Sequence, residues 1–255
     1  MYILVVAVIQ IIGEMFGIYL LRLIKPVPMI MMIIYISGKN AQRDHLVPTL
    51  IRAGLILSLI GDIFLMSSEL SAFMIGTIFF FIAHILYCIA FSIGTPVRSP
   101  TPLNNLLRVL ACIIFLAMFL GNIYSLWNVM PNKILFTSYG FILCMMNILA
   151  IKRYEITTPY SYAFIIAGAA LFGLSDNLLA MLKFNGISTQ IGRGFVMLFY
   201  YSAQYLLMHG AMHHSNLQHE LTKFYKNSTS STVPILSIGK QSSKYGARQW
   251  DHGNG

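Results

Sequence analysis

Long apolar blocks are the feature that most restricts how this chain can fold. Seven blocks are long enough to cross the hydrocarbon core of a bilayer as an α-helix, which takes about 20 residues. They cover residues 2–21, 47–66, 72–92, 104–124, 133–150, 160–183 and 194–212. A helix satisfies its backbone hydrogen bonds within the segment, as lipid surroundings require. The blocks therefore predict an all-α integral membrane protein.

The composition leaves no room for a soluble domain. The chain is 57% hydrophobic and 10% charged, against about 45–50% and 25% in soluble domains. Its net charge of +9 lies mainly in connectors and in the C-terminal part. We interpret that charge as a topology signal and an attraction to anionic membrane lipids, not as a nucleic-acid surface. The three cysteines lie in apolar blocks without metal or redox spacing, so they are assigned no role.

Between the first two blocks lies the shorter apolar segment 25–37, KPVPMIMMIIYIS. Pro26 and Pro28 suit the first turn of a helix, which is either a short eighth span or a re-entrant one. We expect residues 1–212 to form a polytopic transmembrane domain. Residues 213–255 are polar with little periodicity, which is typical of a disordered tail.

An internal repeat favours about eight helices arranged as two related four-helix halves. Ala53-Gly54 precedes Asp62 as Ala167-Gly168 precedes Asp176, with nine residues from alanine to acid in both. The next block also matches, FFFIAHILY at 79–87 against FYYSAQYLL at 199–207. Four helices per half give both copies one orientation, so the short segment is expected to span.

The basic residues give a modest orientation signal. With eight helices, nine of fourteen Lys and Arg residues near the spans fall on the face that holds both termini. By the positive-inside rule that face is cytoplasmic. We expect a multi-pass protein of the endoplasmic reticulum membrane with both termini in the cytoplasm.

Three acidic residues, Glu14, Asp62 and Asp176, lie well inside apolar blocks. An ionised group at membrane depth costs several kcal/mol unless it is paired, hydrated or buried in protein, so function is the default interpretation. Asp62 and Asp176 are expected at one depth, about 6 to 10 Å inside the non-cytoplasmic boundary. Two close carboxylates tend to share one proton, which places an acid beside a base. The alternative is a pair of structural acids that bridge helices, and for Glu14 a structural and a functional role are equally open.

Five further residues are candidates for substrate binding. Lys25 lies at the mouth of the short segment on the face of the acids, where it could bind a lipid phosphate or simply extend to the interface. His84 and Gln204 occupy matching positions of the repeat, about 15 to 18 Å from the same boundary. Asn177 follows Asp176, and Tyr200 begins the matched tyrosine pair.

The segment HGAMHH places His209 and His213 four residues apart, the spacing of a metal pair. They lie about 20 Å from the level of the two aspartates. We therefore assign no metal.

Six short motifs resemble the lysoplasmalogenase, or YhhN-like, family of multi-pass membrane proteins. They occur in the family's order from Leu21 to about Met212: KPVPM, GDIFL, FFFIAHILY, YGFIL, GAALFGLSDNLLA and YYSAQYLL. The resemblance implies an ether hydrolase that cleaves the vinyl ether bond of lysoplasmalogens. The products are a fatty aldehyde and glycerophosphocholine or glycerophosphoethanolamine. The family's two aspartates correspond to Asp62 and Asp176, and no cofactor is implied.

Two other functions remain open on the residues alone. Intramembrane carboxylates and internal repeats are equally typical of a non-enzymatic membrane carrier or binding protein. A zinc-dependent lipid amidase using His84, His209, His213 and an aspartate is the less favoured reading. The partners expected in every case are membrane lipids, and for the hydrolase a lysophospholipid with a vinyl ether chain.

Overall fold

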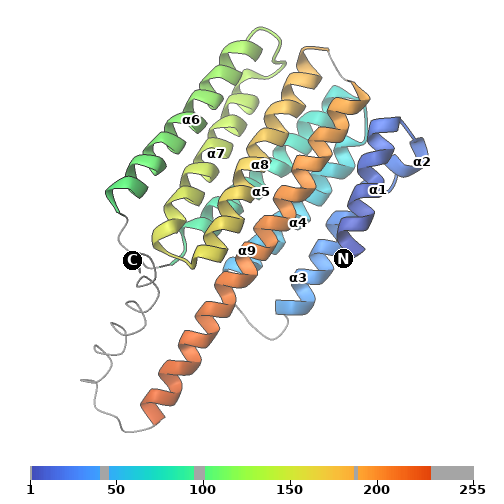
Figure 1. Ribbon diagram of the computed structural model, residues 1–255. Helices are drawn as coiled ribbons and strands as arrows, with labels where there is room; N and C mark the ends of the chain where they lie inside the picture. The colour runs from blue at the N-terminus through green and yellow to red at the C-terminus, as the bar shows by residue number, and fades with distance from the viewer. Residues whose placement is uncertain (1, 41–45, 95–100, 187–188, 231–255) are drawn as a thin grey trace, which may run out of the picture. The chain divides into compact units, whose positions relative to one another are not determined.

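All regular structure in the described part of the chain is helical (Figure 1). The computed structural model describes residues 2–40, 46–94, 101–186 and 189–230, and of Asn40 and residues 215–230 the backbone alone. In chain order the elements are α1 (Tyr2–Phe16), α2 (Tyr19–Arg22), α3 (Val27–Asn40), α4 (Leu46–Leu65), α5 (Leu70–Ser92), α6 (Pro102–Leu126), α7 (Lys133–Lys152), the 3₁₀ turn η1 (Arg153–Glu155), α8 (Pro159–Phe184) and α9 (Gln190–Ser230). The expectation of an all-α chain is confirmed.

Six segments of the described residues are long and apolar enough to cross a membrane. They are Tyr19–Lys39, Leu46–Leu65, Leu70–Ser92, Pro102–Leu126, Lys133–Glu155 and Pro159–Phe184. The predicted count of eight spans is therefore supported in part. α1 has 15 residues, about 22 Å of helix, which is less than the ~30 Å hydrocarbon core. The apolar block of α9 is interrupted by Tyr200, Tyr201 and Gln204, which lower its hydropathy.

The length of the first apolar block predicts a single helix over residues 2–21, but the structure divides this block into α1 and α2. α1 ends at Phe16, and Gly17 adopts φ +70°, a left-handed conformation that favours glycine. The chain then turns back, and a Cβ added to Gly13 would lie 2.3 Å from the Cβ of Leu21. The following segment, 25–37, is helical as α3, and together with α2 it makes the span Tyr19–Lys39.

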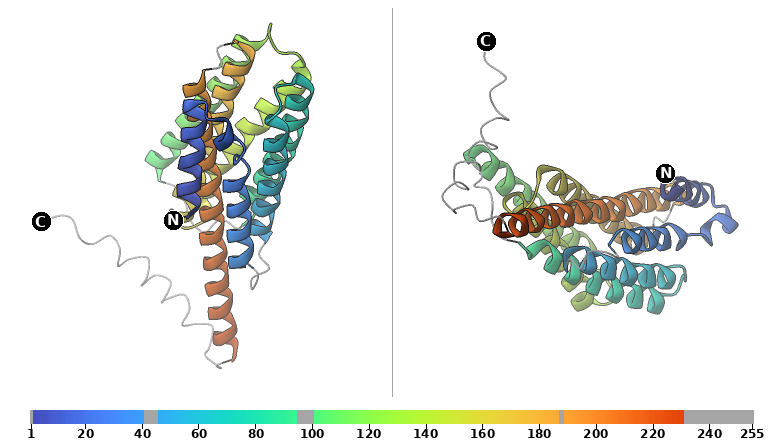
Figure 2. Two further views of the ribbon diagram at one scale, coloured as in Figure 1. Left: turned by 90° about the vertical axis from the view of Figure 1, so that its right-hand side faces the viewer. Right: turned by 90° about the horizontal axis from the view of Figure 1, so that it is seen from below.

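The helices lie side by side, and α4 and α8 run in the same direction (Figures 1 and 2). α4 packs along α5, α5 also packs on α7, and α7 contacts α6 and α8. α9 lies against α8, because the Ser161 hydroxyl donates to the Gly210 carbonyl at 2.7 Å and the Ser175 hydroxyl to the Val196 carbonyl at 3.0 Å. We call the end of the bundle where α4 and α8 end, and where α3 and α9 begin, the upper end.

Two glycines of the sequence repeat make equivalent contacts. A Cβ added to Gly54 of α4 would lie 2.1 Å from the Tyr87 ring of α5, and one on Gly168 of α8 would lie 2.9 Å from Leu207 of α9. Tyr87 and Leu207 occupy the same position in the matched blocks. Small residues let membrane helices approach closely. The repeated glycine is thus where each acid-bearing helix meets the helix that follows it.

α9 continues to Ser230, although we expected the transmembrane domain to end at 212 and a disordered tail to begin at 213. The chain divides into two units, Met1–Ser215 and Asn216–Gly255, close to the predicted boundary at 212. Residues 231–255 lie outside the described residues, as do Arg43 and Arg98 of the orientation count. The disorder predicted for the tail therefore stays a prediction for 231–255.

Candidate active site

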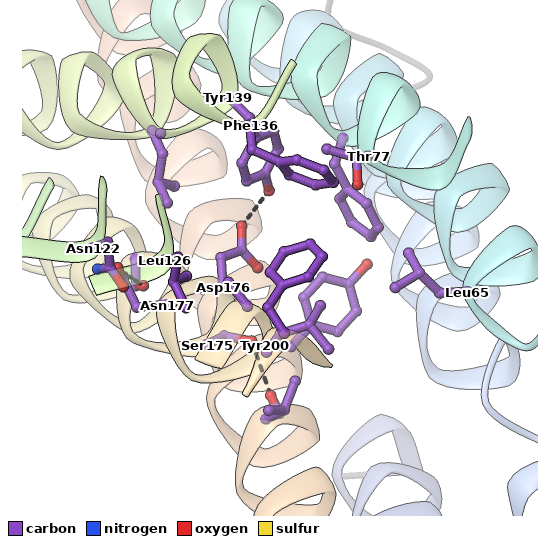
Figure 3. Close-up of a pocket in the computed structure, with 18 of the residues that line it drawn as sticks. Leu65, Thr77, Asn122, Leu126, Phe136, Tyr139, Ser175, Asp176, Asn177 and Tyr200 are labelled. Carbon is purple, nitrogen blue, oxygen red and sulfur yellow. Dashed lines mark hydrogen bonds between the residues drawn. The ribbon is translucent and has the colours of Figure 1, made fainter. Parts of the chain in front are cut away.

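A cavity of about 230 Å³ lies within the helical bundle and receives both intramembrane aspartates. Asp62 comes from the last turn of α4 and Asp176 from α8. Figure 3 shows Asp176 near the centre of the cavity, with Tyr139 and Tyr200 on two sides and Asn122 and Asn177 on a third. The expected convergence of two carboxylates on one space is present.

Asp62 is 2% exposed and has one cationic and one phenolic partner. The Nζ of Lys25 lies 4.0 Å from its Oδ1. The hydroxyl of Tyr200, from α9, donates to its Oδ2 at 2.7 Å. Tyr201 holds the lysine segment in place, since its hydroxyl donates to the Lys25 carbonyl at 2.9 Å. A nearby positive charge and a donated hydrogen bond both favour the carboxylate form.

Asp176 has a different environment. The hydroxyl of Tyr139, from α7, donates to its Oδ2. The Nε2 of His84 lies 3.9 Å from the same oxygen, and the imidazole packs edge-on against Phe172 with ring centroids 4.6 Å apart. The two aspartates are therefore chemically distinct, because a lysine faces one and a buried imidazole faces the other.

His84 and Gln204 lie behind the cavity wall. Both are fully buried, and neither is among the described residues that line the cavity. The Nδ1 of His84 lies 2.6 Å from the Phe80 carbonyl, and its Nε2 has no hydrogen-bond partner among the described residues. Since a carbonyl only accepts, Nδ1 carries a proton, and in the neutral imidazole Nε2 is then an acceptor on the side of Asp176. Gln204 accepts from the Tyr87 hydroxyl at 2.8 Å.

The other predicted binding residues line the cavity. Lys25, Asn177 and Tyr200 all belong to its wall. The side-chain amide of Asn177 donates to the Gly173 carbonyl within α8. Asn177 lies beside Asn122 at the cavity wall (Figure 3).

Glu14 lies in the cavity wall at the upper end, together with two arginines that sequence analysis used only as orientation signals. The Nε atoms of Arg22 and Arg193 both lie 3.4 Å from Glu14 Oε2. The side-chain amide of Gln10 donates to Oε1 at 3.5 Å. Arg193 lines the cavity as well. Glu14 therefore holds two arginines at the cavity, which is a positioning role between the structural and functional alternatives left open above.

The rest of the cavity wall is mostly apolar and comes largely from α6 and α7. Its residues there include Phe115, Met118, Phe119, Ile123, Phe136 and Leu143. Apart from the side chains that face the cavity, α6 is covered little by the rest of the protein, and none of the residues in its most apolar stretch is buried. The cavity therefore combines a cationic upper end, two carboxylates and an apolar wall.

The two histidines of the HGAMHH segment take part in aromatic packing. His209 packs on Tyr205 with ring centroids 4.4 Å apart, and His213 stacks on Phe164 at 5.7 Å. Within the described ranges, no group of three or more His, Cys, Asp or Glu side chains could hold a metal ion. Aromatic packing accounts for this pair.

Tyr139 and Arg193 are the site residues that sequence reasoning missed. Tyr139 lies in YGFIL, one of the six motifs, and its position there was the available signal. Arg193 lies in the first turn of α9. Basic residues are common at the ends of membrane-spanning helices, so the sequence did not single it out as a site residue. Neither residue breaks an apolar pattern as an intramembrane acid does.

Comparison with known sequences assigns the chain to a family. No curated protein and no solved structure gives a significant match. A sequence model described as the YhhN family matches residues 20–211, which include both aspartates, Lys25, Tyr139 and Arg193. The match covers most of the chain and all of the cavity residues except Glu14, and the chain belongs to the YhhN family.

Proposed function

We propose that this protein is a lysoplasmalogenase-type hydrolase that cleaves the vinyl ether bond of a lysophospholipid. The observation that carries the proposal is one cavity in which two carboxylates lie between a cationic end and an apolar wall. An amphipathic substrate fits that order, with its headgroup at the cations, its ether at the acids and its chain along α6 and α7. Membership of the YhhN family is consistent with this activity.

The chemistry needs one acid and one base. A vinyl ether is hydrolysed when its β-carbon takes a proton, which converts the C=C–O group into an oxocarbenium ion. Water then adds to the cationic carbon and loses a proton, giving a hemiacetal. The hemiacetal hydroxyl then loses its proton, the bond from its carbon to the glycerol oxygen breaks, and that oxygen takes a proton as the aldehyde leaves. The net reaction consumes one water, and a proton donor and a nearby carboxylate suffice for every step.

The surroundings of the two aspartates support an assignment of one as the general base and the other as the general acid. Each carboxyl group accepts a hydrogen bond from a tyrosine, but of the two Asp62 alone has a lysine of the described residues beside it. Lys25 favours the carboxylate form, so Asp62 is assigned as the base that stabilises the oxocarbenium ion and receives the proton of water. Asp176 has no lysine or arginine ion pair among the described residues, and it is assigned as the acid. The Nε2 of His84 lies 3.9 Å from Asp176 Oδ2, which is too far for a hydrogen bond, so a neutral imidazole there does not stabilise the carboxylate form of Asp176.

Removing either carboxyl group tests the proposal. Purified protein in detergent or in liposomes should release fatty aldehyde from lysoplasmalogen. Asp62→Asn and Asp176→Asn should each lower kcat by at least about 100-fold, the usual worth of a general acid or base. Asparagine keeps the size of the side chain, so an unchanged thermal unfolding midpoint would show that the fold persists.

Glu69→Gln is the matched control, because Glu69 precedes α5 and is exposed. It should leave aldehyde release unchanged. Full activity in both aspartate variants would refute the mechanism, and no aldehyde from the wild-type protein would refute the activity.

We also propose that both termini face the cytoplasm and that the protein resides in the endoplasmic reticulum membrane. The nine-to-five bias of basic residues counted along the sequence supports the orientation. With that orientation the cationic end of the cavity faces the lumen. Co-localisation with a marker of the reticulum membrane tests the compartment.

A further inference from the structure

The cavity's upper end carries more positive than negative charge while Asp176 is the protonated acid. Arg22, Lys25 and Arg193 contribute three positive charges, and Glu14 and Asp62 contribute two negative ones when ionised, which leaves one positive charge. A phosphodiester carries one negative charge and would balance it. Surplus cations beside a largely buried cavity are costly unless an anion completes the group.

Glu14 holds the arginines in a defined arrangement. Its Oε2 contacts the Nε of both Arg22 and Arg193, and its own side chain is 12% exposed. The two arginine side chains remain 31% and 34% exposed, and Arg193 lines the cavity, so an anion in the cavity can reach the Arg193 guanidinium group. A guanidinium carries five N–H donors in a planar fork, which suits paired phosphate oxygens.

Two helix N-termini add to the positive potential at the same place. Arg193 lies in the first turn of α9, and Lys25 lies two residues before α3 begins. The N-terminus of a helix carries a partial positive charge, which attracts phosphate groups. These dipoles reinforce the side-chain cluster.

The spacing matches a glycerophospholipid. The three-carbon glycerol unit separates its ether oxygen from the phosphate by about 5 Å. The Nζ of Lys25 lies 4.0 Å from Asp62 Oδ1, so a phosphate at Lys25 brings the ether bond of the same molecule to the carboxylates. The apolar wall then receives the chain.

We propose that Arg193 and Lys25, with Arg22 and Glu14 as positioning residues, form a subsite for the phosphodiester of the lipid headgroup. The subsite rests on the proposed function and explains how the enzyme would select its substrate by the phosphate group. It predicts a preference for phosphate-bearing vinyl ether lipids over the corresponding 1-alkenylglycerol, which has the same chain and ether but no phosphate.

Kinetics with these two substrates test the subsite. Wild-type protein should have the higher kcat/KM on alkenyl-glycerophosphoethanolamine. Arg193→Gln should reduce this preference by about 10- to 100-fold, mainly through KM, as expected for a lost charge-assisted contact. Arg193→Lys keeps the positive charge but loses the planar guanidinium, so its preference for the phosphate-bearing lipid should lie between those of the wild type and Arg193→Gln. Glu14→Gln should raise KM for the phosphate-bearing lipid by a smaller factor.

Lys133→Gln is the matched control. Lys133 is exposed at the upper end, where it stacks on Trp127 at 4.6 Å, and it does not line the cavity. Removing its charge should leave the preference unchanged. Equal kcat/KM for the two substrates in the wild-type protein, or an equal rise in KM for both in Arg193→Gln, would overturn the subsite.

A binding measurement separates the subsite from the activity. Glycerophosphoethanolamine, titrated into the detergent-solubilised full chain and followed by calorimetry, should bind to the wild type and at least 10-fold more weakly to Arg193→Gln. Inorganic phosphate should bind more weakly than the diester and compete with it. If neither lipid releases aldehyde but this binding pattern holds, the hydrolase proposal fails and the subsite stands. If the diester does not bind, or free phosphate binds more tightly, the headgroup subsite fails.

Discussion

At the scale of single residues, each aspartate of the cavity is paired with a phenol from another helix. Tyr200 of α9 donates to Asp62, and Tyr139 of α7 donates to Asp176. A hydrogen bond to a charged group contributes about 1.5–3 kcal/mol, and its loss frees the carboxyl group to rotate. These hydroxyls are therefore expected to set the geometry of the reaction without taking part in bond breaking.

Replacing either phenol tests this role. Tyr200→Phe should lower kcat by about 10- to 100-fold, as the energy of one charge-assisted hydrogen bond predicts, and Tyr139→Phe should lower it by a smaller factor, because Asp176 is the neutral acid. KM should change less, because the ring that packs in the cavity wall is retained. Steady-state aldehyde release measures both constants.

Tyr124→Phe is the control, because Tyr124 on α6 is 88% exposed. It should behave as the wild type. A kcat that is unchanged in both cavity variants would show that the phenols only fill space.

The sequence identified the two aspartates because a carboxylate inside an apolar block is costly and therefore rare. It did not identify Tyr139, since tyrosine is ordinary in membrane helices and its hydroxyl direction depends on the packing of α7 against α8. His84 was expected to line the site, and burial places it one layer behind. Side-chain direction, unlike helical periodicity, depends on contacts distant in sequence.

At the scale of helices, close approach at small residues determines which helices lie side by side. Gly54 fixes the contact of α4 with α5, and Gly168 fixes that of α8 with α9. At Gly168 an added Cβ would also lie 3.0 Å from the carbonyl oxygen of Ala203, which is backbone and yields little. Both contacts lie below the acids and support the helices that carry them.

Gly54→Ala and Gly168→Ala should each destabilise the protein by about 1–3 kcal/mol, the usual cost of overpacking. Thermal unfolding in detergent, followed by intrinsic fluorescence, should show a lower midpoint for both. Gly121→Ala is the control, because nothing lies within 4 Å of an added Cβ on α6. It should be neutral or slightly stabilising, as alanine favours a helix interior. Equal midpoints for all three variants would contradict the packing role of the repeat.

The hydropathy pattern predicted every long helix, but it did not predict the end of α1 at Phe16. Residues 2–21 form one continuous apolar run in sequence, and the break at Gly17 does not interrupt it. A single glycine is tolerated in a helix, so its left-handed conformation follows from the return of α2 onto α1. That return brings Arg22 to Glu14, a contact between residues eight positions apart that a straight helix would not allow.

At the scale of the whole transmembrane unit, orientation decides which leaflet supplies the substrate. The cationic end of the cavity lies at the upper end, since Lys25 precedes α3 and Arg193 lies in the first turn of α9. The α6–α7 connection lies at the same end, and α3 ends at the lower end (Figure 1). The proposed orientation therefore places Asn128 in the lumen and Lys39 in the cytoplasm. Both residues are exposed in the structure.

Single cysteines at these positions test the orientation in sealed microsomes. In a background with Cys88, Cys112 and Cys144 replaced by alanine, a membrane-impermeant maleimide should label Lys39→Cys at once. It should label Asn128→Cys only after the membrane is permeabilised, because the bilayer excludes a charged reagent. The reverse pattern would place the cationic end in the cytoplasm, so the headgroup would have to enter from the cytoplasmic leaflet. Aldehyde release by both variants should equal that of the cysteine-free background, since neither Lys39 nor Asn128 lines the cavity.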